Sequence, residues 1–226
     1  MLDVITKKEY FAWFEQGIVD KNNHSLKGIQ DGYILSFLDK AQGQKIAEIG
    51  GGNSRVLQKI KTTNECWNID KFEALGNGPT DIKQADGIKI IRQYLGKFDK
   101  KIPANYFDVV FSVSVVEHVE TLLLEDFFKD CYRILKPNGE MIHAVDLYVG
   151  ESPLQGNSRV ENYIEAITKA GFKWDTTPQV NKDLVFKPHF ASNSDATMGI
   201  WNKAVPSLRA LREENQSITL KVRVTK

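Results

Sequence analysis

Three consecutive glycines, Gly50, Gly51 and Gly52, follow a short apolar run that begins at Lys45. Glycine has no β-carbon, so a turn made of glycines lets the backbone come close to a ligand, and here a helical pattern follows the turn directly. Glu48 lies two residues before the first glycine, where a carboxylate can face a cation or organise the loop. The sequence therefore predicts a ligand-binding turn at this point.

Two further carboxylates follow short apolar runs, as an adenosine-type ligand would require. Asp70 lies 20 residues after Gly50, the spacing at which an acidic side chain accepts both hydroxyls of a ribose. The run 81–85, interpreted as a strand, leads into Asp86 and Gly87. This would bring the Asp86 carboxylate to the same rim, where it could accept from an adenine amino group.

The run Phe107–Val116 is apolar enough for a buried strand, and it would deliver Ser112, Glu117 and His118 to the carboxyl edge of a sheet. Open α/β sheets bind their ligands at that edge. His118 is the candidate general base, because imidazole titrates near neutral pH. The other interpretation is that His118 caps the following helix or packs beside the ligand.

A nicotinamide dinucleotide is the alternative ligand for the glycine turn, because dinucleotide-binding folds use similar chemistry at the same place. The third glycine of the Gly-x-Gly-x-x-Gly fingerprint would fall at Arg55, and Glu48 would stand beside the pyrophosphate. Both residues oppose that ligand. An oxidoreductase therefore stays the alternative function.

The elements that must position these residues alternate along the chain. Helical patterns begin after a capping box at Thr6 and Glu9 and continue over 26–41, and from Lys45 short apolar runs alternate with helices, which predicts βαβ units and a parallel sheet. The predicted strands are 45–49, 66–69, 81–85, 107–116 and 141–149, with an alternating strand at 217–224. The predicted helices after Lys45 are 54–60, 121–135, ended by the Pro-Asn-Gly run at 137–139, and 158–171, with weaker patterns at 172–176 (strand) and 205–214 (helix).

In this order the motifs resemble those of the class I S-adenosylmethionine-dependent methyltransferases, in the small-molecule, methyltransferase type 11-like branch. The matching segments cover about 45–149 and are Glu48-x-Gly50-x-Gly52, Asp70, Asp86-Gly87, 107–110 leading into 116–119, and 135–139. The resemblance implies a Rossmann-like sheet of seven mostly parallel strands, helices on both faces and an antiparallel last strand. Its single domain, 1–226, would comprise a helical N-terminal extension (1–44), a cofactor-binding core (45–149) and a C-terminal part with the acceptor pocket (150–226).

The same resemblance implies S-adenosyl-L-methionine as cofactor. Gly50, Gly51 and Gly52 would approach the methionine moiety, Asp70 the ribose, Asp86 the adenine, and the backbone of Ser112 the amino-acid end. Further cofactor-binding residues would be Glu48, Lys71 and Gly87. Ser114 replaces a carboxylate by which some similar quinone-type enzymes hold a divalent metal, so no metal is expected. Methyl transfer to a small-molecule or sugar acceptor, with oxygen favoured over nitrogen or carbon, is the predicted function. A catalytically silent methyltransferase-like binding module is the other alternative.

Composition sets the remaining expectations. Thirty Lys and Arg against 29 Asp and Glu give a net charge of +1, which does not favour generic nucleic-acid binding. No signal-peptide pattern and no apolar stretch of about 18 residues is present, so a cytoplasmic protein without membrane contact is expected. Cys66 and Cys131 lie in apolar contexts that suit reduced thiols. The acceptor pocket would draw on the loop-like segment with His189 and Trp201, and the pattern leaves the oligomeric state open.

Overall fold

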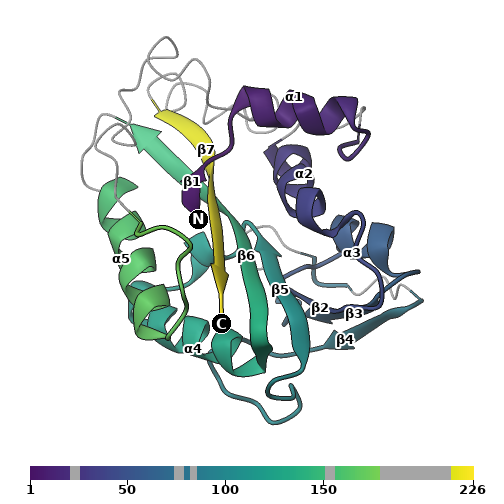
Figure 1. Cartoon of the computed structure of the whole chain (residues 1–226). Coiled ribbons are helices and arrows are strands. Elements are labelled where there is room, and N and C mark those ends of the chain that lie inside the picture. The colour runs from purple at the N-terminus through teal and green to yellow at the C-terminus, as the bar shows by residue number, and fades with distance from the viewer. Residues whose placement is uncertain (21–25, 74–78, 82–85, 151–155, 179–214) are drawn as a thin grey trace.

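One twisted sheet forms the middle of the molecule (Figure 1). This computed structural model describes residues 1–20, 26–73, 79–81, 86–150, 156–178 and 215–226. Within these ranges the sheet has seven strands in the order β1-β7-β6-β5-β2-β3-β4. The strands are β1 (Leu2–Val4), β2 (Lys45–Ile49), β3 (Glu65–Ile69), β4 (Ile88–Ile91), β5 (Phe107–Val113), β6 (Leu135–Gly150) and β7 (Asn215–Thr225).

The direction of the strands fixes where a ligand can bind. Strands β2 to β6 all run parallel to one another. Strand β7 runs antiparallel to β6, and β1 runs antiparallel to β7. From β2 the chain first builds the sheet outward through β3 to β4, and then returns to β5 on the other side of β2. The strand order therefore reverses between β2 and β5, and open α/β sheets bind ligands at the carboxyl ends of the strands at such a switch point.

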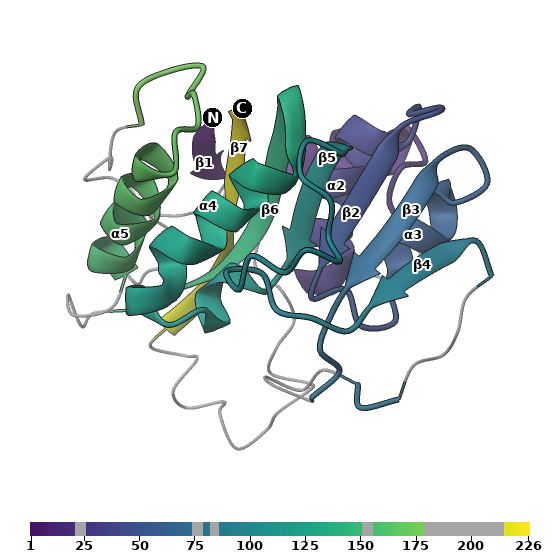
Figure 2. The same ribbon diagram turned by 90° about the horizontal axis from the view of Figure 1, so that it is seen from below.

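Helices cover both faces of the sheet (Figures 1 and 2). The face with α2 and α3 is opposite the face with α4 and α5, as the view from below shows (Figure 2), and α1 lies beside α2 (Figure 1). A 3-10 turn, η2, lies between β5 and α4, and another, η3, directly precedes α4. The bounds are α1 (Lys7–Glu15), α2 (Leu26–Leu38), α3 (Arg55–Ile60), η2 (Val116–His118), η3 (Thr121–Leu123), α4 (Leu124–Ile134) and α5 (Gly156–Lys169).

Two hydrophobic cores result, one on each face, because neighbouring side chains of a strand point to opposite sides. In β2, Ile46 packs with the first three helices and Ala47 packs toward α4 and α5. Each core contains one free, buried cysteine: Cys66 lies in the core of the first face and Cys131 in the other. The predicted layers, the parallel sheet and the antiparallel last strand are therefore confirmed.

The first helix starts as its sequence predicts. The backbone N–H of Glu9 donates to the Thr6 hydroxyl at 3.2 Å, and the Glu9 carboxylate accepts from the N–H of Thr6 at 2.9 Å, which completes the capping box. The same carboxylate accepts from the ammonium of Lys221 on β7 at 2.6 Å. Lys221 is 3% exposed, so this ion pair connects α1 to the sheet in a buried place.

The predicted third parallel strand is wrong in position. Asp81 lies in a bend, 82–85 lie outside the described residues, and β4 begins only at Ile88, after the turn formed by Asp86 and Gly87. An Asp-Gly pair is a turn signal that can precede a strand as well as follow one, and the sequence pattern did not distinguish the two.

Other boundaries differ by a few residues. Strand β5 ends at Val113 and the chain then turns into η2, whereas α4 ends at Ile134, ahead of Pro137 as predicted. The Pro-Asn-Gly run lies in the irregular first part of β6, where the register against β5 shifts. Helix α5 begins at Gly156, two residues before the predicted start, and of the predicted strand 172–176 only Lys173 pairs, with Thr225. The predicted helix at 205–214 lies outside the described residues.

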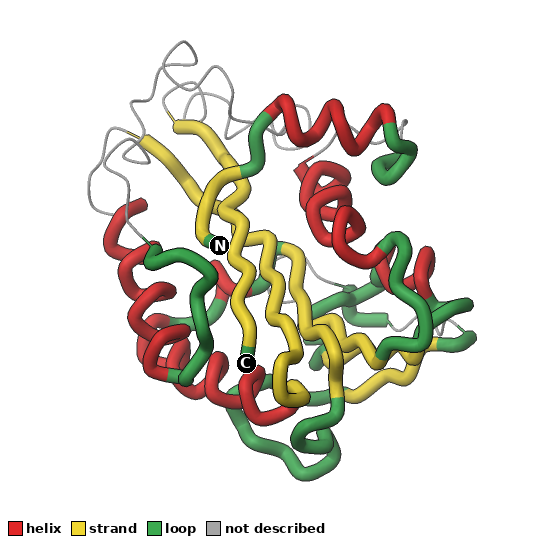
Figure 3. The backbone as a smooth tube through the Cα atoms, in the orientation of Figure 1, coloured by secondary structure: helices red, strands yellow, loops and turns green. Residues whose placement is uncertain are grey.

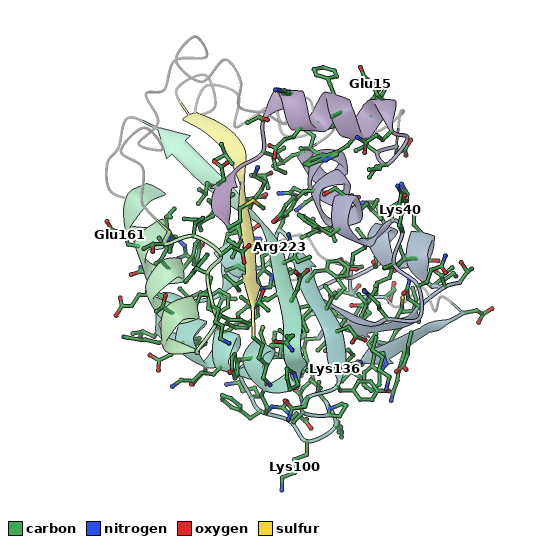
Figure 4. The ribbon with its side chains drawn as sticks, viewed as in Figure 1. Glu15, Lys40, Lys100, Lys136, Glu161 and Arg223 are labelled. Carbon is green, nitrogen blue, oxygen red and sulfur yellow. The ribbon has the colours of Figure 1, made fainter. Side chains whose placement is uncertain are left out.

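The last strand crosses the sheet beside β6 along its full length (Figure 3). Arg223 lies over the middle of this strand pair, whereas Glu15, Lys40, Lys100 and Glu161 point outward (Figure 4). The Arg223 guanidinium donates to Glu140 on β6 at 2.5 Å and lies over the Phe37 ring of α2 at 4.5 Å.

No helix in the described ranges is long and apolar enough to cross a membrane.

Candidate functional site

The glycine turn lies at the carboxyl end of β2, at the switch point, and is packed tightly against its neighbours. Gly50 and Gly52 have φ of 63° and 50°, which L-residues with side chains rarely adopt. A β-carbon on Gly50 would stand 2.6 Å from Cγ2 of Val115, the second residue after β5, and one on Gly51 would stand 2.8 Å from Oδ1 of Asn68. Only glycine fits at these positions.

Glu48, near the end of β2, holds the glycine turn through the residue that begins α3. Its carboxyl group is buried and accepts a short hydrogen bond from the Ser54 hydroxyl, and the same hydroxyl accepts from the N–H of Leu57 at 2.9 Å as the N-cap of α3. Burial raises the pKa of Glu48 to about 8. Of the two roles that the sequence left open for Glu48, the structure places it in the second, as the residue that joins β2 to the start of α3.

Asp70 lies at the carboxyl end of β3 and holds the glycine turn from the side. Its Oδ2 accepts from the N–H of Gly52 at 2.8 Å, and its Oδ1 accepts from the N–H of Phe72 at 2.6 Å. The Asn68 amide donates to the carbonyl of Gly52 at 2.7 Å. A carboxylate oxygen can accept two hydrogen bonds, so each oxygen of Asp70 keeps one acceptor position. The half-buried carboxylate can therefore still accept from two ligand hydroxyls.

The predicted place of Asp86 and Gly87 is wrong. Both precede β4, and a β-carbon on Gly87 would stand 3.7 Å from Lys61, the residue that ends α3 at the amino-terminal edge of the sheet. Asp86 is exposed there. Because the glycine turn lies at the opposite edge, these two residues do not join the other candidate residues.

Other residues occupy the rim at the carboxyl end of β4. Gln93 and Tyr94 follow this strand, and the Tyr94 hydroxyl donates to Glu73 at 2.6 Å. Lys71, directly after Asp70, pairs with the same Glu73 at 2.9 Å. Sequence reasoning missed Gln93 and Tyr94 because it placed the strand too early; the apolar run at 88–91 was the available signal.

Ser112 lies inside β5, with its side chain in the core. Its hydroxyl is 2.7 Å from Nδ1 of His143 on β6, and both residues are fully buried. Burial lowers the pKa of His143 to about 3, so this imidazole is neutral at physiological pH. Its ring packs against Phe127 and Phe128. The Ser112 side chain is engaged in its contact with His143. The backbone of Ser112 stays the part predicted to contact the amino-acid end of the cofactor.

His118 ends the 3-10 turn η2 and its side chain is 55% exposed, with Nε2 4.0 Å from Oε1 of Glu117. The neighbouring Glu117 carboxyl, in contrast, is buried. Gln30 on α2 also reaches this edge, where it contacts Ser114 and Asp146. Sequence reasoning missed Gln30, because one glutamine in an apolar helix gives no signal of its own. His189 and Trp201 lie outside the described residues.

Comparisons with known proteins agree with this geometry. The family model described as "Methyltransferase domain" matches residues 47–143, somewhat less than half of the chain. A search of curated proteins finds no match. Among solved structures, phosphoethanolamine N-methyltransferase 2 from Haemonchus contortus, in complex with S-adenosyl-L-methionine, is similar with a TM-score of 0.57 and 17% identity over 97% of this chain and 56% of that chain. The chain thus spans about half the length of that enzyme.

Two further structures show how widely the fold is used. An S-adenosylmethionine-dependent methyltransferase from Mesorhizobium loti has a TM-score of 0.52 and 16% identity over 86% of this chain and 96% of that chain. The [4+2]-cyclase SpnF has a TM-score of 0.55 and 12% identity over 92% of this chain and 86% of that chain. These identities support the fold, while activity must be argued from the site. Residues 47–143 match the methyltransferase-domain family model, and the chain shares its fold with these S-adenosylmethionine-dependent methyltransferases.

Proposed function

We propose that the chain is an enzyme that transfers a methyl group from S-adenosyl-L-methionine to a small-molecule or sugar acceptor. The observation that carries this proposal is the contact between Asp70 and Gly52, because it joins the carboxylate that we propose binds the ribose to a glycine turn at the switch point of the sheet. The match of residues 47–143 to the methyltransferase domain supports it.

The residues at this edge fit such a cofactor. The turn Gly50–Gly52 presents backbone where a side chain would collide with its neighbours, which suits close approach by the methionine portion. Asp70 keeps acceptor positions for the ribose hydroxyls, and Lys71 and the backbone of Ser112 are proposed to contact the remaining polar groups. Bound S-adenosylmethionine supplies an activated methyl group, so the protein's own contribution is to align a nucleophile with it and to exclude water.

The acceptor belongs to this proposal too. The similar structures include proteins named as acting on phosphoethanolamine at nitrogen and on geranyl diphosphate at carbon, so relatives by fold differ in the atom that they methylate. Oxygen, which the sequence analysis favours, stays a prediction. His118 likewise stays the predicted base for a hydroxyl acceptor. The buried carboxyl of the neighbouring Glu117 supports nitrogen as the acceptor atom instead.

Calorimetric titration of the protein with S-adenosylhomocysteine, and separately with NAD, tests the cofactor. We expect saturable binding of S-adenosylhomocysteine and none of NAD. Binding of NAD alone would contradict the proposal and would favour an oxidoreductase. Binding of S-adenosylhomocysteine without labelled-methyl transfer to any of many acceptors would instead favour a silent binding module.

A further inference from the structure

We propose that the methyl acceptor is a cationic amine, and that the partly buried polar cluster formed by Gln30, Ser114, Glu117 and Asp146 binds its ammonium group and takes its proton. This inference rests on the function proposed above and deepens it. The four residues come from α2, from the residue after β5, from η2 and from β6, so the fold brings them together from distant parts of the sequence.

The cluster lies beside the glycine turn. Ser114 directly follows β5 and is fixed by its backbone N–H, which donates to the carbonyl of Ala144 on β6 at 2.8 Å. The next residue, Val115, is the one whose side chain would collide with a β-carbon on Gly50. An acceptor bound at the cluster would therefore stand next to the turn that is proposed to hold the methyl donor.

Three of the four side chains form a preorganised network. The Gln30 amide donates a short hydrogen bond to Oδ1 of Asp146, and the Ser114 hydroxyl lies 2.7 Å from Oε1 of Gln30 and 3.0 Å from Oδ1 of Asp146. Gln30 is fully buried. Ser114 has φ of 52°, a conformation that residues with side chains rarely adopt. The hydrogen bonds of the network hold its hydroxyl in place.

Glu117 has buried acceptors without a partner. Both of its carboxyl oxygens are buried, and among the described residues neither has a partner in good hydrogen-bond geometry, although the backbone N–H groups of Glu117 and Asp146 lie close enough to lower the pKa in part. Burial, and then the negative charge of Asp146, raise the pKa of Glu117 to about 8. Buried polar groups normally have partners, because an unsatisfied one costs free energy. A ligand that donates hydrogen bonds and carries positive charge would therefore stabilise the carboxyl group of Glu117.

In the described part of the chain, three basic side chains lie near the cluster, but none donates a hydrogen bond shorter than 4.0 Å to either carboxyl group. Lys27 on α2 is 4.0 Å from Oδ2 of Asp146, and His118 is 4.0 Å from Glu117. Arg159 on α5 donates to the backbone carbonyl of Glu117 at 2.9 Å and to the Tyr163 hydroxyl at 3.0 Å. Its guanidinium therefore holds the backbone of η2 and does not pair with the Glu117 carboxyl group.

An ammonium group satisfies this arrangement, because it carries three N–H donors and one positive charge. A neutral hydroxyl would bring no positive charge to favour the ionised form of Glu117, and an anionic acceptor would be repelled by Asp146. In the reaction, the ammonium N–H bond breaks and its proton goes to the Glu117 carboxylate, which becomes a carboxylic acid. The freed nitrogen lone pair then forms the N–C bond as the C–S bond breaks toward sulfur, giving a methylated ammonium ion and S-adenosylhomocysteine, and Glu117 later loses the proton to solvent.

Binding to the S-adenosylhomocysteine complex tests the proposal without requiring turnover. The probes are matched pairs, benzylamine against benzyl alcohol and glucosamine against glucose, followed by calorimetry in buffers of different ionisation enthalpy. We expect at least one amine to bind at least about tenfold more tightly than its alcohol, a difference of about 1.4 kcal/mol. We also expect its binding to release protons near neutral pH, because the ammonium drives Glu117 toward its ionised form.

Variants assign these effects to the cluster. Glu117→Gln should weaken amine binding about tenfold or more and abolish the proton release, and Asp146→Asn, as a second isosteric change, should weaken amine binding as well. Glu120→Gln, at an exposed glutamate three residues further, is the matched control and should change neither. Thermal unfolding and S-adenosylhomocysteine affinity check that each variant is folded.

The outcomes separate the two proposals. Failure of the wild-type protein to bind S-adenosylhomocysteine would overturn the proposed function, and this inference with it. If S-adenosylhomocysteine binds, then absence of amine binding, preference for the alcohols, or unchanged amine binding and proton release in Glu117→Gln would each overturn the amine site alone. Labelled-methyl transfer to the bound amine, lost in Glu117→Gln, completes the expected result.

Discussion

The Asp70 carboxylate holds the glycine turn and is also proposed to hold the ribose of the cofactor, so its removal should have two effects. It accepts from the backbone N–H groups of Gly52 and Phe72, and it is proposed to accept from the ribose of the cofactor. A substitution therefore removes ligand contacts and also leaves two backbone donors without their partner. Stability and affinity must be measured together to separate these effects.

We predict that Asp70→Ala weakens binding of S-adenosylmethionine by about 1.5–3 kcal/mol, the scale of lost hydrogen bonds to a charged group. Calorimetric titration measures the affinity, and thermal unfolding shows how much of the change comes from a loosened turn. Asp86→Ala is the matched control, because this exposed aspartate lies at the opposite edge of the sheet. Unchanged affinity in Asp70→Ala would show that this carboxylate does not hold the ribose.

Gly50→Ala tests the packing of the glycine turn. The substitution imposes φ of 63° on alanine, which costs about 1–2 kcal/mol, and it drives a β-carbon to 2.6 Å from Val115. Gly43→Ala is the control, since Gly43 has φ of 66° but open space around the added carbon. In urea unfolding, Gly50→Ala should destabilise more than Gly43→Ala, and a Val115→Ala background should reduce the difference. Equal losses would show that Val115 does not restrict the turn.

At the scale of elements, α1 is attached to the sheet by one buried ion pair. The Lys221 ammonium on β7 is 2.6 Å from the Glu9 carboxylate and 3.8 Å from that of Asp3 on β1. Lys221 is almost fully buried, whereas Glu9 is partly exposed. Removing the carboxylate would leave a buried ammonium with one distant partner, which is more costly than removing the ammonium itself.

Glu9→Gln should therefore destabilise the protein more than Lys221→Met does, by on the order of 1–3 kcal/mol after allowance for the exposure of Glu9. Glutamine can still complete the capping box at Thr6, so the helix start is preserved. Urea unfolding of the two single variants and the double variant measures the coupling. A coupling energy of zero would contradict the importance of this pair.

The same scale shows how far the sequence could predict the fold. The strand Lys45–Ile49 and the start of α1 follow from local chemistry, an apolar run before glycines and a capping box, and both lie where predicted. The strand Leu2–Val4 was not predicted, because three residues are too few to form a pattern and its partner β7 is more than 200 residues away. Long-range pairing of this kind leaves no local signal.

The site divides in a similar way. Glu48, Asp70 and the glycine turn were found because each lies in or directly after a recognisable strand. Asp86 was misplaced because an Asp-Gly turn marks either end of a strand. Gln30 could not be found, since its contact with Asp146 spans 116 positions of sequence and depends on how α2 packs on the sheet.

At the scale of the whole molecule, two buried acids set the pH dependence of stability. Burial raises the pKa of both Glu48 and Glu117 from 4.5 to about 8. The folded protein therefore holds these protons more tightly than the unfolded chain does. Their contribution to the free energy of unfolding is complete below about pH 4.5 and is lost as the pH rises toward 8. Carboxylates with a lowered pKa, such as Asp108, change the free energy of unfolding only at lower pH.

We predict that the free energy of unfolding falls between about pH 6.5 and pH 8, above the range in which the lowered pKa of His143 acts in the opposite sense, and that Glu117→Gln makes this fall shallower. Urea unfolding followed by tryptophan fluorescence at several pH values measures the slope. Glu120→Gln, which changes an exposed carboxylate, should keep the wild-type slope. A wild-type stability that rises over this range would contradict the prediction.

The two cysteines offer a way to observe each half of the molecule separately. Burial raises the pKa of Cys66 to about 11 and that of Cys131 well above its ordinary value, so neither thiol is ionised at neutral pH. Because one lies in each hydrophobic core, a thiol-specific dye can label Cys66 only when the face with α2 and α3 opens, and Cys131 only when the face with α4 and α5 opens. Labelling rates of the two single-cysteine variants would thus report, as natural probes on opposite sides of one sheet, which layer opens first and whether cofactor binding slows both.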